Sequence, residues 1–205
     1  VVLGLLLIGN AYANKNNKFF ADFTYWDNLK KVQKDFYAKG ALDSWGYHIW
    51  NQAPDQQKDK LISQFRYCIE KEFQFFQKNM FLLGWDDGDN AADEIFNWSA
   101  AACSNLSNTD GYKNIKVEKN KPIENVNIDI WKQMDKTNKK EYLAGYTDGA
   151  ISIVRMTIAN ENAPQEMKDY YKKLLNIIYK CFDSKGIETY AKFAIAKKID
   201  KSFPI

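Results

Sequence analysis

The chain has 205 residues, of which 45% are hydrophobic and 15% aromatic, and its formal net charge is +3. This composition excludes an intrinsically disordered chain. With only four prolines and ten glycines, the composition favours helices over a protein of strands and turns. Arg66 and Arg155 are the only arginines, so the bidentate contacts typical of nucleic-acid binders are nearly absent. We expect an all-α protein that does not bind nucleic acid.

The first thirteen residues have the pattern of the end of a secretory signal peptide. An apolar run, Val1 to Ile8, is followed by small residues at Ala11 and Ala13. This pattern predicts cleavage after Ala13 and a mature chain in a periplasm or outside a cell. The alternative is a short buried helix or a membrane anchor, but the run is shorter than the ~20 residues that span a bilayer. We expect no membrane span in the mature chain.

A spaced signature occurs twice, at positions 26–43 and 131–148. The first copy is Trp26-x2-Leu29-x4-Lys34-x2-Tyr37-x2-Gly40-x2-Asp43, and the second is Trp131-x2-Met134-x4-Lys139-x2-Tyr142-x2-Gly145-x2-Asp148. A repeat at fixed offsets predicts an internal duplication. We therefore expect two related helical halves of about three helices each, packed as one bundle-like unit. The halves would be residues 14–105 and 127–205, joined by a linker at residues 106–126.

The first half should contain three helices after an extended or loosely helical lead-in at 14–25. Apolar residues at spacings of three and four, together with Pro54 at a helix start, place these helices at about 31–52, 54–82 and 90–103. The segment 85–89 is a predicted turn, and Asp89 or Asn90 should cap the third helix.

The polar linker contains one candidate strand, at residues 112–118. In the second half, Trp131 and Met134 should form a short turn, and Asp135 should cap the next helix. The predicted helices of this half are 136–159, 164–182 and, after Gly186, 187–201.

The chain has three cysteines, Cys68, Cys103 and Cys181. If the second and third helices form an antiparallel hairpin, residues equidistant from its turn lie opposite each other. This geometry predicts a disulfide between Cys68 and Cys103, with Cys181 left over, as an oxidising compartment would allow. The alternative is three buried, reduced thiols.

The shared Tyr-x2-Gly-x2-Asp element forms one stripe on a helix. A glycine inside a helix usually marks a close approach by another backbone, because it otherwise costs up to ~1 kcal/mol against alanine. Asp43 and Asp148 then have two interpretations. They accept hydrogen bonds from a neighbouring helix N-terminus or a Trp indole, which is the favoured structural role, or they form a carboxylate pair for metal or acid–base chemistry.

His48 is the only histidine. Its aromatic neighbours favour a packing role over a catalytic one, and a single histidine without a CxxC pair disfavours a zinc site. The acidic segment 86–89, with Asp93 and Glu94, does not follow the ligand spacing of an EF-hand and is interpreted as a helix-capping turn. No nucleotide-binding or hydrolase motif occurs. We expect no metal and no cofactor.

The segment from Trp131 to Gly149 resembles a motif of small exported bacterial proteins of unknown function. Envelope immunity proteins that neutralise secreted toxins are similar in type, being small, exported, helical and disulfide-bearing. The hypothesis is a non-catalytic exported binding protein, of an immunity or adaptor type, whose partner is a protein or a small envelope ligand. Its candidate binding residues are Tyr37, Asp43, Trp50, Tyr142, Tyr146 and Asp148. The alternative is an enzyme that uses Asp43 and Asp148, with His48 as a further candidate, and is assisted by a metal.

Overall fold

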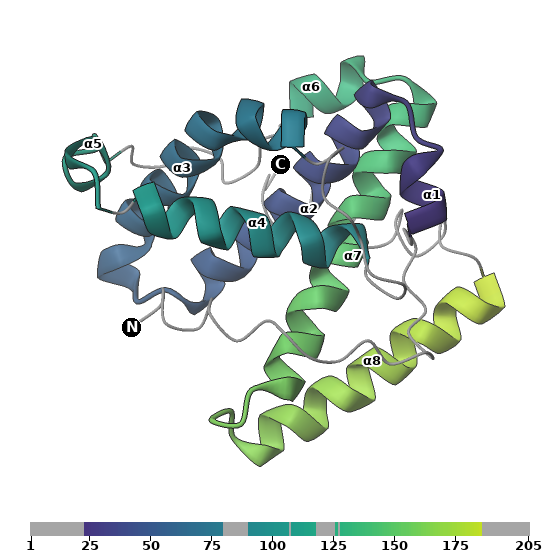
Figure 1. Cartoon of the computed structure of the whole chain (residues 1–205). Helices are drawn as coiled ribbons and strands as arrows, with labels where there is room; N and C mark the ends of the chain where they lie inside the picture. The colour runs from purple at the N-terminus through teal and green to yellow at the C-terminus, as the bar shows by residue number, and fades with distance from the viewer. Residues whose placement is uncertain (1–22, 80–89, 107, 118–125, 127, 186–205) are drawn as a thin grey trace.

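The computed structural model describes residues 23–79, 90–106, 108–117, 126 and 128–185. These residues form eight α-helices and one short 3-10 helix, and they contain no strand (Figure 1). The helices are α1 (Phe23–Asp27), α2 (Lys31–Gln52), α3 (Lys58–Asn79), α4 (Ala91–Leu106), α5 (Asp110–Lys113), α6 (Ile128–Gln133), α7 (Lys136–Ala159) and α8 (Gln165–Lys185). The all-α class is confirmed. Within the described helices, none combines the length and the apolar character that crossing a membrane requires.

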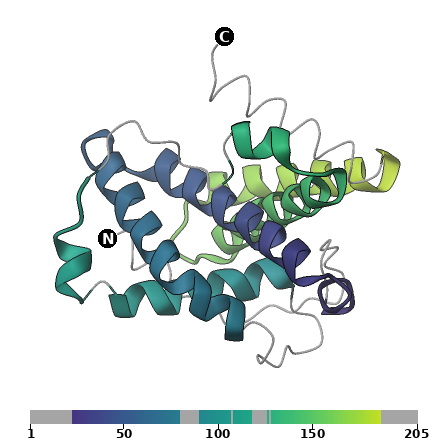
Figure 2. The same ribbon diagram turned by 90° about the horizontal axis from the view of Figure 1, so that it is seen from above.

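Two long helices, α2 and α7, form the centre of the molecule and make its most extensive helix–helix contact. The helices α3 and α4 pack on α2 and on each other, whereas α8 packs mainly on α7. Both views show α3 and α4 on one side of the central pair and α8 on the other (Figures 1 and 2). Each of the two central helices follows a short helix that carries a tryptophan: α1 precedes α2, and α6 precedes α7.

The predicted boundaries of α2 and α7 are those found in the structure. Asp135 caps α7, since its carboxylate accepts the backbone N–H of Asn138 at 2.7 Å. Asn90 caps α4 in the same way, by accepting the N–H of Asp93 at 2.9 Å. The helix predicted from Pro54 begins later, because a 3-10 turn at Asp55–Gln57 precedes α3.

Two local predictions are wrong. The candidate strand at 112–118 does not form in its described part, because Thr109 caps the short helix α5 by accepting the N–H of Tyr112. Trp131 lies in a helix, α6, rather than in a turn. The predicted signal segment, the turn at 85–89 and the helix at 187–201 lie outside the described residues.

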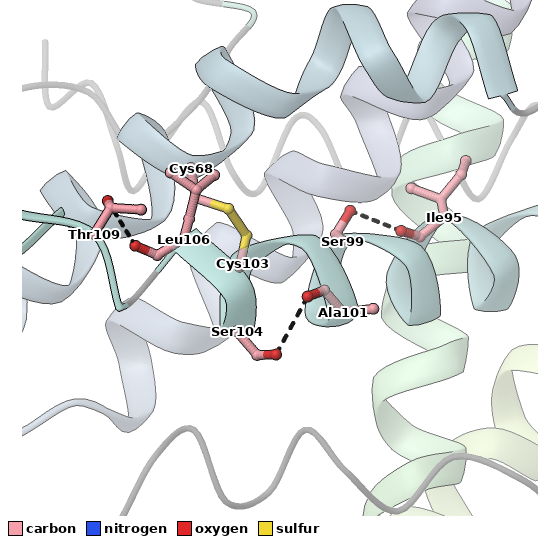
Figure 3. The surroundings of a disulfide bond; sticks show 8 residues. All are labelled: Cys68, Ile95, Ser99, Ala101, Cys103, Ser104, Leu106 and Thr109. Atoms are coloured by element: carbon pink, nitrogen blue, oxygen red, sulfur yellow. Dashed lines mark hydrogen bonds between the residues drawn. A yellow bond between two sulfur atoms is a disulfide. The ribbon is translucent and has the colours of Figure 1, made fainter. Parts of the chain in front are cut away.

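A disulfide between Cys68 and Cys103 joins α3 to α4, with a Cα–Cα distance of 5.5 Å. The predicted pairing is therefore confirmed. Figure 3 shows its setting on α4, where the Ser99 hydroxyl donates to the carbonyl of Ile95 at 2.7 Å. Both cysteines belong to the main hydrophobic core, which also contains Trp26 and Tyr37. The bond thus holds α3 and α4 to each other beside α2.

Candidate functional site

The contact between α2 and α7 is closest at two glycines, Gly40 and Gly145. A Cβ atom built on Gly40 would lie 2.0 Å from the carbonyl oxygen of Tyr142, and one built on Gly145 would lie 1.9 Å from that of Tyr37. No side chain fits at either distance, so the two helices touch backbone to backbone. The predicted role of these glycines, which is to let two helix backbones approach closely, is confirmed.

Across this contact each aspartate of the repeated signature binds the tyrosine of the other copy. The Tyr37 hydroxyl donates to Oδ2 of Asp148 at 2.6 Å, and the Tyr142 hydroxyl donates to Oδ2 of Asp43 at 2.8 Å. Tyr37, Asp43 and Asp148 are 0% exposed and Tyr142 is 3% exposed. The donors are thus tyrosine hydroxyls, rather than the helix N-terminus or Trp indole that the sequence predicts. Asp43 also accepts the backbone N–H of Val126 at 3.1 Å.

The tryptophans and lysines of the signature take equivalent positions in the two copies. Trp26 packs edge-on against Tyr37 with ring centroids 5.5 Å apart. Trp131 packs in the same manner against Tyr142 at 5.9 Å. The ammonium group of Lys34 lies 5.5 Å from the ring centre of Trp26, and that of Lys139 lies 5.5 Å from Trp131. Each tryptophan thus packs against the tyrosine of its own copy and lies near that copy's lysine.

Burial and nearby negative charge keep Tyr37 and Tyr25 protonated. Burial raises the pKa of Tyr37 well above its usual value, and the adjacent carboxylate of Asp148 raises it further. Burial also raises the pKa of Tyr25, whose hydroxyl donates to the buried carboxylate of Glu141. Because a protonated phenol is a hydrogen-bond donor, both tyrosines remain suited to hold a carboxylate.

A second polar junction, which is not predicted from the sequence, joins the start of α4 to α7. Asp93 accepts a hydrogen bond from the Ser152 hydroxyl and one from Nη1 of Arg155 at 3.4 Å. From the sequence, Asp93 is interpreted only as part of an acidic helix-capping turn. The sequence indicates one side of this junction, because Ser152 and Arg155 are three residues apart and share one face of α7, but it does not indicate that Asp93 is their partner.

The remaining candidate residues lie away from the glycine contact or at its edge. His48 is half-buried with its ring edge-on to Trp45 at 6.3 Å, and burial lowers the pKa of its imidazole. Trp50 is half-buried near the end of α2, where the ammonium group of Lys58 lies 4.7 Å from its ring centre. Tyr146 is half-buried beside Tyr142. Of the six predicted binding residues, Trp50 and Tyr146 keep accessible surface, and the other four lie inside the helix contact.

No known protein family, curated protein or solved structure matches this chain. Among the described residues, no three His, Cys, Asp or Glu side chains are grouped so as to hold a metal ion. The acidic segment 86–89 lies outside them. At the centre of the molecule, buried aspartate carboxylates therefore accept hydrogen bonds from tyrosine hydroxyls, and these bonds join α2 to α7.

Proposed function

We propose that the chain is a non-catalytic helical binding protein that works in a periplasm or outside a cell and recognises a protein or a small envelope ligand. The observation that carries this proposal is the burial of Asp43 and Asp148, each bound by a tyrosine of the opposite helix. These interactions stabilise the pairing of α2 and α7. Such a pairing supplies a rigid scaffold for a recognition surface.

The surface best suited to recognition lies at the end of α2 and the start of α3. Tyr47 and Trp50 stack with ring centroids 6.4 Å apart, and the ammonium group of Lys58 lies over the ring of Trp50. Aromatic side chains held rigidly with a cation beside them are typical of the residues that dominate binding energy at interfaces. This aromatic site keeps Trp50, one of the residues predicted to bind, on the accessible surface.

The disulfide supports the proposed compartment. Cys68 and Cys103 are bonded to each other, and structural disulfides persist mainly in oxidising environments such as the periplasm or the cell exterior. The N-terminal pattern that ends at Ala13 points the same way.

The reciprocal contacts also support the proposed duplication. Equivalent glycines, tyrosines, aspartates and tryptophans of the two signatures meet in equivalent ways across the pairing of α2 and α7. An ancestral module that paired with a second copy of itself would leave this arrangement after fusion of the two genes.

The enzymatic alternative requires Asp43 and Asp148 to reach a substrate. A substrate would have to displace Tyr37 and Tyr142 and separate two helices that touch through their backbones. We therefore prefer the binding protein. Thermal stabilisation by magnesium, manganese or calcium ions that vanishes in the Asp43→Asn, Asp148→Asn double variant would favour the enzyme instead.

A comparison of matched surface variants tests the binding function. The purified chain is immobilised, exposed to envelope extract and culture medium of the organism that encodes it, and its bound components are quantified. We expect a component that is retained by the wild type and by Val32→Ala, which alters an exposed site elsewhere on α2. Trp50→Ala should lower its affinity by about 30-fold or more. Retention that is independent of Trp50 would contradict the proposed site.

A further inference from the structure

The helix α8 carries an apolar stripe that no other described helix covers. Met167 is 42% exposed, and Tyr170 and Ile177 are each 63% exposed. Leu174, which lies between them, is half-buried. In Figure 1, α8 forms the lower edge of the molecule, and none of the labelled helices lies beyond it. We define these four residues as the α8 stripe.

The spacing of the α8 stripe is that of a coiled-coil seam. Successive members are separated by three, four and three residues, which is the alternation of the a and d positions of a heptad. The neighbouring apolar residues Tyr171 and Leu175 are half-buried, consistent with the packing of α8 on α7. The exposed stripe is therefore narrow, and a narrow seam suits one partner helix better than a lipid surface does.

We propose that the α8 stripe is the contact between two copies of this chain, with the two α8 helices antiparallel. An axis near Lys172 places Met167 against Ile177 of the second copy, and Tyr170 against Leu174 of the second copy. The seam then contains four apolar layers related by a twofold axis, as in other isologous dimers.

The charges beside the stripe select the antiparallel arrangement. Glu166 and Lys180 are exposed and occupy equivalent heptad positions on the same side of the stripe, at its opposite ends. In an antiparallel pair each Glu166 meets Lys180 of the second copy, so that two ion pairs form. In a parallel pair Glu166 would lie beside Tyr171 instead, and neither ion pair could form. Lys173 lies between Glu166 and Lys180 on the same side of the stripe, so in the antiparallel pair it meets Lys173 of the second copy near the twofold axis.

Sedimentation equilibrium of the purified chain, measured over a wide concentration range, tests this dimer. The dimer and the proposed binding function are independent, so either can fail without the other. We expect a reversible dimer that Ile177→Asp dissociates. The single variants Glu166→Lys and Lys180→Glu should each raise the dimer dissociation constant about five- to tenfold, and the double variant should restore it. Lys173→Gln should lower this constant, because it removes like charges from the axis.

Circular dichroism and thermal melting serve as folding controls, since all of these side chains are exposed on α8. A wild-type chain that stays monomeric at every concentration would overturn the proposal, whether residues 186–205 or a different protein cover the stripe. A dimer that is unaffected by Ile177→Asp would also overturn it, as would a double charge variant that remains as weak as the single ones. Binding of the monomer to vesicles of anionic phospholipid, lost in Ile177→Asp, would assign the stripe to a membrane surface instead.

Discussion

At the scale of single residues, two glycines determine how closely the central helices approach. The free energy lost by placing glycine inside a helix, about 1 kcal/mol each, is offset because the tyrosine hydroxyls can then reach the aspartates opposite. A wider separation would break the hydrogen bonds of 2.6 and 2.8 Å. The glycines and the Tyr–Asp pairs therefore act as one unit.

Gly40→Ala and Gly145→Ala should each destabilise the protein by about 3 kcal/mol or more, because the added methyl group meets a backbone carbonyl that cannot move away alone. The free energy of unfolding in urea measures the effect. Gly111→Ala is the matched control, since the closest atom to its methyl group would be the hydroxyl oxygen at the flexible end of the Tyr67 side chain, with no backbone atom in the way. Equal stabilities for the three variants would contradict the backbone contact.

The pKa of Tyr37 predicts how stability depends on pH. Its folded-state pKa is raised by burial and by Asp148, whereas an unfolded tyrosine ionises near pH ~10. Its contribution is therefore fully present below about pH 10 and is lost as the pH rises further, by up to about 1.4 kcal/mol per pH unit.

Unfolding measured between neutral and strongly alkaline pH should show this loss in the wild type and a shallower loss in Tyr37→Phe. At a concentration at which the chain is monomeric, Tyr170→Phe, which alters an exposed tyrosine, should behave as the wild type does. Parallel pH profiles for all three proteins would contradict the assignment of the buried phenol.

At the scale of elements, the disulfide should account for much of the stability of the α3–α4 pair. It closes a loop with a sequence separation of 35, for which chain entropy gives about 3–4 kcal/mol. The Cys68→Ala, Cys103→Ala variant should lose a free energy of unfolding of that order. Reductant should destabilise the wild type and leave this variant unchanged, as urea unfolding would show. A wild type that is equally stable with and without reductant would contradict this role.

Helix ends were predictable where the stopping and capping signals are local. The limits of α2 and α7 follow from apolar spacing, from Asp135 and from the proline that follows each helix. The disulfide followed from hairpin symmetry. Local signals also misled: Pro54 starts a 3-10 turn rather than α3, and a strand was expected where Thr109 caps a helix. In both places a short-range hydrogen-bonded turn determined the outcome.

At the scale of the whole molecule, the sequence indicated which residues matter at the centre but not which residues they contact. The stripe of Tyr, Gly and Asp predicted a close helix contact. It did not reveal that each aspartate binds the tyrosine of the other copy, because that pairing depends on the register and direction of two helices about a hundred residues apart. For the same reason the link from Asp93 to Arg155 and the partner of Tyr25 were not foreseen.

The pairing of α2 and α7 also explains why four of the six predicted binding residues are buried. Tyr37, Asp43, Tyr142 and Asp148 are conspicuous in the sequence because the helix pairing needs them. A spacing pattern alone does not distinguish a residue that binds a ligand from one that binds another helix. Burial makes this distinction here, and it leaves Trp50 and Tyr146 as the accessible members of the set.

The free energy of unfolding of the Asp43→Asn, Asp148→Asn double variant tests the central claim most directly. If both carboxylates join α2 to α7, their replacement should cost about 3–5 kcal/mol, because each weakens a charge-assisted hydrogen bond and buries an amide with unmet donors. Glu70→Gln with Glu161→Gln, at exposed positions, changes the net charge equally and should cost less than about 1 kcal/mol. A double aspartate variant as stable as this control would contradict the claim.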